Sequence, residues 1–282
     1  MAFNYQTLQR ITGSAIVAGN VSTADLAQNS VQAAEISANA VTDAKLANSS
    51  VNVGGTKVTG SLPVSKGGTG LGSVGGNLQT LRSTGSALQY ADIGMRSMQV
   101  FTGTTTWNRP AGVRFIHVQV VGGGGGGSGH GESGGAGGYS ERILNVDSIA
   151  SVSVSIAGES GGTYYSGAGG NGSGSSFGPY ISCGGGYGAN RNNQHSGGLA
   201  GVGSGGNLNL YGGGGGSHHE SIGPGGQSFW GGSVAGGHPQ GGNFAHNHQS
   251  HSAPGSGGRG GYYQGHRGSN GRPGLVVVTE YR

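Results

Sequence analysis

Glycine makes up about a third of the segment from Gly122 to Gly274, and this limits what the chain can fold into. Of the 69 glycines in the 282-residue chain, 54 lie in this segment. Collagen requires glycine at every third position together with abundant proline. The segment instead contains continuous runs such as Gly122–Gly127, and the whole chain has only seven prolines. A collagen helix is therefore excluded.

Two interpretations of the glycine-rich segment remain. It can be a flexible coil, because glycine loses the most backbone entropy on ordering and has no side chain to bury. Alternatively, its runs form extended left-handed helices with three residues per turn, whose outward N–H and C=O groups pair with neighbouring runs. The non-glycine residues favour the ordered alternative, because a linker has no need of aromatic residues spread along its length.

The composition argues against one large hydrophobic core. Only 9% of residues are charged and 32% are hydrophobic, so we expect stability to depend on a partner chain, on glycine packing, or on both. Cys183 is the single cysteine, which excludes an intramolecular disulfide framework and a cysteine-based zinc site; we expect it to be buried. We expect no signal peptide in residues 1–20 and no membrane span.

An apolar residue recurs at every fifth position near the start of the chain. A period of five matches neither a helix stripe nor one face of a strand. Winding three chains around one axis would turn these residues inward, and a single-chain pentapeptide β-helix is the alternative. The predicted trimer core comprises Ile11, Ile16, Val21, Leu26, Val31, Ile36, Val41, Leu46 and Val51.

Three motifs resemble parts of tailed-bacteriophage tail fibres. The ten-residue units that begin at Val21, Val31 and Val41, followed by Leu-Pro-Val-Ser-Lys-Gly-Gly-Thr-Gly at 62–70, resemble the fibre shaft. Thr-Trp-Asn-Arg-Pro-Ala-Gly at 106–112 with 115–125 resembles the opening of the glycine-rich terminal domain, and 271–278 resembles its close. The resemblance implies a homotrimer made in the host cytoplasm and located in the virion. Its N-terminus would attach to a tail or capsid protein, and its C-terminal tip would contact the host.

The predicted fold is mostly β or irregular: a trimeric fibrous shaft, then a C-terminal glycine-rich β-sandwich containing packed polyglycine-II-like runs. We expect one or two short strands within 78–93. Because strands 114–121 and 275–281 bracket the glycine block, we expect its ends to lie close together and its runs to fold back and forth. The other expected strands are 98–103, 139–146 and 150–157. The expected domains are 1–20 for virion attachment, 21–60 for the shaft, 61–97 for a neck and 98–282 for the tip.

Several functions are poorly supported by the sequence. No Gly-x-x-x-x-Gly-Lys-Ser/Thr motif is present and lysine is absent beyond residue 66, so a nucleotide-binding loop is not expected. The acidic residues after 100 form no recognisable catalytic pair; Glu132 with His130 comes nearest, and we expect no enzymatic activity. Arg259-Gly-Gly and Arg267-Gly near tyrosines are too few for an RNA-binding segment, and we expect no nucleic-acid partner.

The tract His-Asn-His-Gln-Ser-His at 246–251 suggests a metal site. An extended His-x-His places both imidazoles on one side of a strand. Three chains around an axis would offer six nitrogens from His246 and His248, which suits iron or another first-row metal. Some trimeric phage fibre tips resemble this. The alternative is a polar exposed loop without metal.

The aromatic and polar interruptions of the glycine segment are the expected receptor-binding residues. Tyrosine and tryptophan provide a large contact area at low entropic cost, while Asn, Gln, His and Arg supply directional hydrogen bonds. A host surface glycan or an outer-membrane protein is the expected partner. The alternatives are a purely structural fibre, in which the tip caps the trimer, and an ice- or surface-binding glycine sandwich. The candidates are Tyr164, Tyr165, Arg191, Asn192, Asn193, His195, His218, His219, Phe229, Trp230, Phe244, Tyr262 and Tyr263, with His246 and His248.

Overall fold

The computed structural model divides the chain into two compact units, Met1–Gly72 and Ser73–Arg282. The described residues are 79–164, 167–190, 196–217, 223–232, 253–261 and 267–282, with Ser22, Ala24, Ile36, 69–71 and 75–76. They belong almost entirely to the second unit. Of the predicted trimer core only Ile36 is described, with 46% of its surface exposed. The other members, Ile11, Ile16, Val21, Leu26, Val31, Val41, Leu46 and Val51, lie outside the described residues.

Strands are the regular elements of the second unit, and no helix occurs among the described residues. None of these residues therefore forms a helix long and apolar enough to cross a membrane. The mostly-β prediction is confirmed, as are strands at the five predicted places and in 78–93. The strands are β1 (Gln79–Ser83), β2 (Leu88–Asp92), β3 (Met95–Phe101), β4 (Thr105–Asn108), β5 (Phe115–Val121), β6 (Tyr139–Asn145), β7 (Ser151–Ser155), β8 (Ser175–Phe177), β9 (Ile181–Cys183), β10 (Gly203–Ser204), β11 (Leu208–Leu210) and β12 (Leu275–Tyr281).

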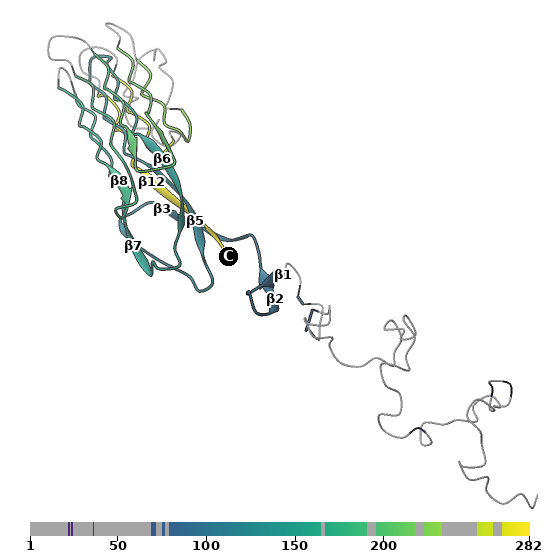
Figure 1. Ribbon diagram of the computed structural model, residues 1–282. Helices are drawn as coiled ribbons and strands as arrows, with labels where there is room; N and C mark the ends of the chain where they lie inside the picture. The colour runs from purple at the N-terminus through teal and green to yellow at the C-terminus, as the bar shows by residue number, and fades with distance from the viewer. Residues whose placement is uncertain are drawn as a thin grey trace, which may run out of the picture. The chain divides into compact units, whose positions relative to one another are not determined.

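Two five-stranded antiparallel sheets form a sandwich, with β1 and β2 as a separate hairpin (Figure 1). One sheet has the order β11-β6-β5-β12-β3 and the other β10-β9-β8-β7-β4. Strands such as β7, with alternating buried valines and exposed serines, turn one face inward. The core between the sheets contains Trp107, Ile116, Val118, Val120, Leu144, Val152, Val154, Phe177, Ile181, Val276 and Val278.

A fully buried carboxylate, Glu280 on β12, joins the two sheets. The indole N–H of Trp107 on β4 donates to Glu280 Oε1 at 2.8 Å, and Gln99 Nε2 on β3 donates at 2.7 Å. The hydroxyl of Ser97 also donates to this carboxylate. A buried charge is costly unless it accepts several hydrogen bonds, and these three donors satisfy that requirement. Trp107, part of the motif that resembles fibre tips, therefore has a structural role here.

Pairing between β5 and β12 brings the two ends of the glycine block together. Val121 lies opposite Leu275 in the register of the two strands, so the chain leaves and re-enters the sandwich at neighbouring points, as predicted. Cys183 lies buried beside this junction and its thiol donates to the carbonyl of Val120 at 3.1 Å. Burial raises the pKa of Cys183 to about 12, so the thiol stays protonated at neutral pH.

The glycine runs form a hydrogen-bonded lattice with a three-residue repeat. The N–H groups of the run 122–127 change neighbour at each residue and return to the first neighbour after three residues. They donate in turn to the runs 135–138, 170–173 and 269–272. A recurrence of three is the signature of an extended helix with three residues per turn. The ordered interpretation is therefore confirmed.

Six other runs surround this central run. Besides the three that accept from it, the segments 186–189, 258–261 and 160–163 donate to its carbonyl oxygens, the last partly through the Ser160 hydroxyl. Figure 1 shows the runs as wavy traces that continue from the strand ends in one direction. The lattice thus extends the sandwich and satisfies backbone groups without side chains.

Close approach of the backbones explains why glycine is required inside the lattice. A Cβ atom added at Gly126 would overlap the carbonyl group of Gly161, and one added at Gly124 would overlap that of Ser256. Neighbouring backbone at this distance cannot yield without breaking lattice hydrogen bonds. At Gly158, on the surface, an added Cβ would meet nothing within 4 Å.

We predict that Gly126→Ala lowers the free energy of unfolding by about 3 kcal/mol or more, because overpacking displaces two runs. Gly158→Ala is the matched control and should be neutral, or stabilising by at most about 1 kcal/mol through the unfolded state. Urea denaturation of both variants provides the measurement. Equal stabilities of the two variants would contradict the lattice packing.

Candidate functional site

The ten runs of the described structure are arranged as five antiparallel pairs. Within each pair, backbone hydrogen bonds recur at every third residue, as in Gly184 to Val202 and Tyr187 to Leu199. One end of the pairs adjoins the strands, and the opposite end is here called the distal end. The pairs are 122–128 with 133–138, 157–163 with 168–174, 184–190 with 196–202, 212–217 with 223–227, and 255–261 with 267–274.

The distal end brings together segments that are far apart in the sequence. The N–H of Gly261 donates to the backbone carbonyl of Ser128, and the N–H of Gly223 donates to the backbone carbonyl of Gly131. Tyr164 forms a β-bridge with Arg267, whose guanidinium carbon lies 5.6 Å from the centre of the tyrosine ring. Such a cation–π contact holds both side chains in place at the surface. Tyr164 remains 51% exposed.

Nine other candidate residues belong to short segments that interrupt the described distal run ends. Described residues bracket each of these four segments on both sides: 164 and 167, 190 and 196, 217 and 223, 261 and 267. Tyr164 is the one of these ten candidates that the structure describes. The other nine lie outside the described residues: Tyr165, Arg191, Asn192, Asn193, His195, His218, His219, Tyr262 and Tyr263.

Phe229 and Trp230 belong instead to the connection at the strand end of the runs. The Phe229 ring stacks on Tyr139, the first residue of β6, with ring centres 3.6 Å apart. Trp230 packs edge-on against both rings. Burial of Tyr139 raises the pKa of its phenol. Phe229 and Trp230 therefore have a packing role, although they remain 50% and 39% exposed. Phe244, His246 and His248, in the same connection, lie outside the described residues.

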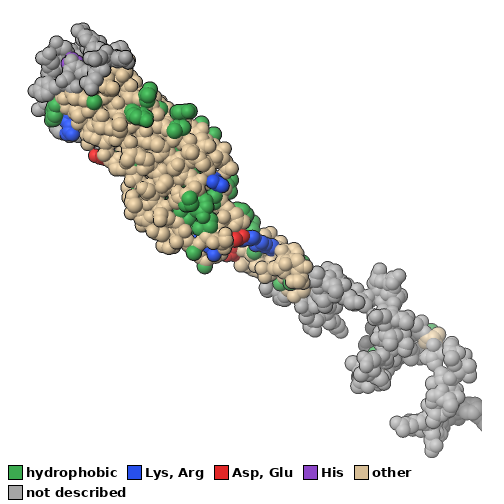
Figure 2. All heavy atoms as spheres, turned by 60° about the vertical axis from the view of Figure 1, so that its left-hand side comes forward, with side chains coloured by type: hydrophobic (Ala, Val, Ile, Leu, Met, Phe, Trp, Pro, Cys, Tyr) green, Lys and Arg blue, Asp and Glu red, His purple; other side chains and the backbone are tan. Residues whose placement is uncertain are grey.

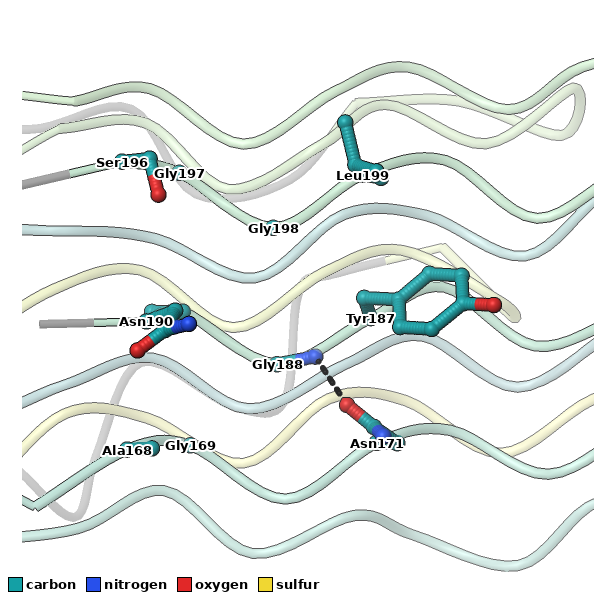
Figure 3. A pocket seen from close by; sticks show the side chains of 11 residues that line it. Ala168, Gly169, Asn171, Tyr187, Gly188, Asn190, Ser196, Gly197, Gly198 and Leu199 are labelled. Atoms are coloured by element: carbon teal, nitrogen blue, oxygen red, sulfur yellow. Dashed lines mark hydrogen bonds between the residues drawn. The ribbon is translucent and has the colours of Figure 1, made fainter. Parts of the chain in front are cut away.

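A shallow open groove of about 470 Å³ crosses three neighbouring runs on one side of the lattice (Figure 3). Side chains project at every third residue from each run. One row consists of Asn171, Tyr187 and Leu199, and the second row consists of Ala168, Asn190 and Ser196. The floor between the rows is glycine backbone, including Gly169, Gly188, Gly197 and Gly198.

The described residues that line the groove carry no charge and combine an aromatic side chain with polar groups. Tyr187 and Leu199 are 54% and 71% exposed, and Asn171 Oδ1 accepts a hydrogen bond of 2.9 Å from the Gly188 N–H. Sequence reasoning did not identify these residues. The signal that could have found them is their three-residue spacing, as in Ala168 and Asn171 or Ser196 and Leu199.

Acidic and histidine residues in the described structure do not gather into a metal site. Glu132 is fully buried and accepts a hydrogen bond from the Ser128 hydroxyl, four residues away at the distal turn. Within the described residues no group of three or more His, Cys, Asp and Glu side chains could hold a metal ion. The predicted metal ligands, His246 and His248, are not among these residues.

Comparison with protein families places the lattice and the sandwich together in one domain. A family model described as a glycine-rich domain matches residues 99–281. The chain belongs to the glycine-rich domain family. A comparison with curated proteins found no match. The glycine-rich domain therefore includes all strands from β4 onward and all ten runs.

We predict that Phe229→Ala lowers the free energy of unfolding by about 2 kcal/mol, because it uncovers the buried ring of Tyr139 and removes a stacked pair. Tyr211→Ala is a suitable control, since Tyr211 is 77% exposed. Denaturation monitored by near-ultraviolet circular dichroism would measure both variants. A Phe229→Ala protein as stable as the control would exclude this packing role.

Proposed function

We propose that the chain is a phage fibre protein whose glycine-rich tip recognises the host cell surface non-covalently. The N-terminal end would attach to a tail or capsid protein of the virion, and three chains would form the fibre. The receptor would be a surface glycan or an outer-membrane protein. The proposal rests on the motifs shared with fibre shafts and tips and on the arrangement of the distal end.

The observation that carries this proposal is the position of the run ends. Four of the five distal connections contain tyrosine, histidine, asparagine or arginine candidates, and the fifth contains His130 and Glu132. The lattice fixes the ends of each connection by backbone hydrogen bonds, so the connections can change in sequence while the scaffold is kept. An array of such segments on a rigid support suits recognition of an extended surface.

Assembly of several chains is supported by the outer face of the sheet β11-β6-β5-β12-β3. Alternation along the strands turns Val100, Met98, Phe115 and Ile143 away from the core, and their exposed fractions range from 41% to 66%. On the side of the molecule drawn in Figure 2, hydrophobic side chains stand out in several places from a surface formed mostly by backbone and uncharged polar side chains. Exposed apolar residues grouped on one face of a sheet are typical of protein–protein contacts.

Ionisable groups on this outer face already have partners within the face. The Tyr139 hydroxyl donates to Glu141 at 2.7 Å, which holds the pKa of that carboxyl below its usual range. His117 lies 3.2 Å from the same carboxylate. A second copy of the chain could therefore pack on this face without meeting an unpaired like charge. We propose this copy as the occupant of the face.

The tip proposal predicts that the full chain binds intact host bacteria. Replacing Tyr164, Tyr262 and Tyr263 together by Ser should weaken this binding about tenfold or more, because exposed aromatics dominate recognition. Tyr211→Ser is the control, because it replaces an exposed tyrosine by serine away from the distal end. It should leave the binding unchanged. A folded trimer that binds no cell in a broad host panel, with tip changes affecting only stability, would favour the purely structural fibre.

Self-assembly predicts a specific cross-linking pattern in the full chain. A V100C/I143C double variant should give covalent dimers and trimers with a short bismaleimide, because these positions would face a second copy. Leu199 and Tyr211 are also exposed, but they lie outside the proposed interface. The matched L199C/Y211C variant should therefore give no cross-linked dimers or trimers. The buried thiol of Cys183 would not react at neutral pH. A monomeric mass by light scattering, or equal cross-linking of both variants, would contradict the proposed interface.

A further inference from the structure

The lateral groove of Asn171, Tyr187, Asn190, Ser196 and Leu199 has the chemistry of a carbohydrate site. We infer that it binds a neutral oligosaccharide of the host surface, a ligand class that deepens the proposed function and rests on it. The inference concerns the side of the lattice, whereas the candidates discussed above belong to the distal connections or to the strand-end connection.

The spacing of the rows sets the width of the groove. A helix with three residues per turn rises about 3.1 Å per residue, so side chains three residues apart along a run are separated by about 9 Å. The groove between the two rows therefore accepts a flat ring lying on the glycine floor. The floor itself cannot be filled by mutation, because an added Cβ at Gly188 would overlap the carbonyl of Gly169.

The residues of the groove favour a neutral ligand with one apolar face and many hydroxyl groups. No Lys, Arg, His, Asp or Glu occurs among the described lining residues, so nothing there would compensate the desolvation of a phosphate or carboxylate. The half-exposed ring of Tyr187 offers an apolar face beside a hydroxyl. The amides of Asn171 and Asn190 and the Ser196 hydroxyl offer donors and acceptors. Pyranose rings present C–H faces and hydroxyl edges that match this set.

An extended peptide fits the groove less well. Peptides that add to a sheet need a row of unpaired backbone groups at an edge. Here the lattice uses the main-chain N–H groups: that of Tyr187 donates to Leu199, and that of Gly169 to Ala189. The N–H of Gly188 donates to the side chain of Asn171. Side chains, and not the backbone, therefore provide most of the recognition.

The test uses the full chain on a printed array of neutral and acidic oligosaccharides, together with binding to intact bacteria. Array presentation lets several copies bind at once and detects weak single-site affinity. We expect signals on neutral oligosaccharides that fall at least about tenfold in Tyr187→Ala. Tyr187→Phe should keep most of the signal, and Leu199→Gln should weaken it. Tyr211→Ala, an exposed tyrosine outside the groove, should leave it unchanged. Thermal melting confirms that each variant is folded.

Each other outcome overturns the inference in a recognisable way. Neutral-glycan binding that survives both Tyr187→Ala and Leu199→Gln would place the site elsewhere. An equal loss in Tyr211→Ala, or a signal on acidic oligosaccharides only, would also exclude the groove. Binding to cells without binding to any oligosaccharide would refute the carbohydrate inference while leaving the proposed function intact. Binding to neither would refute both.

Discussion

The tip depends on hydrogen bonds between the backbone N–H and C=O groups of neighbouring glycine runs, which have almost no side chains to bury. Buried backbone groups must find partners, and an extended three-residue helix cannot supply them internally. A run at the centre of the lattice must therefore be enclosed by others, as the run 122–128 is by six. Ordering glycine also costs more backbone entropy than ordering any other residue. The lattice consequently needs a support that limits this cost.

The β-sandwich provides that support. Its core of Trp107, Phe177 and aliphatic residues is conventional, and the runs continue directly from its strands. All five run pairs are joined at the distal end by connections of four or five residues, which keeps loop-closure entropy low. The pairing of β5 with β12 then closes the whole block. The sandwich thus fixes the distances between the first residues of the runs, and the lattice hydrogen bonds continue from there.

The sequence predicted the parts of this fold that depend on local patterns. Alternation identified β7, and the apolar stretches identified β5 and β12. Glycine runs interrupted by aromatic residues identified the ordered lattice. It did not predict β8, because three residues carry too little periodicity. Nor did it predict the role of Glu280, whose donors Ser97, Gln99 and Trp107 come from strands more than 170 residues earlier in the chain. The groove depends on which runs become neighbours, and composition does not contain that information.

A lattice of this kind restricts where a binding function can evolve. At most glycine positions inside it an added Cβ would meet neighbouring backbone, as at Gly124 and Gly126. Two kinds of position remain free: the connections at the distal end, and the outward residue in each turn of a surface run. Tyr187 and Leu199 occupy positions of the second kind. Because these outward positions are held in rows by paired backbones, a ligand there meets a preorganised surface and does not have to order it. The close approach of backbones that requires glycine inside the tip therefore leaves the ends and sides of the lattice as the places where side chains can bind a ligand.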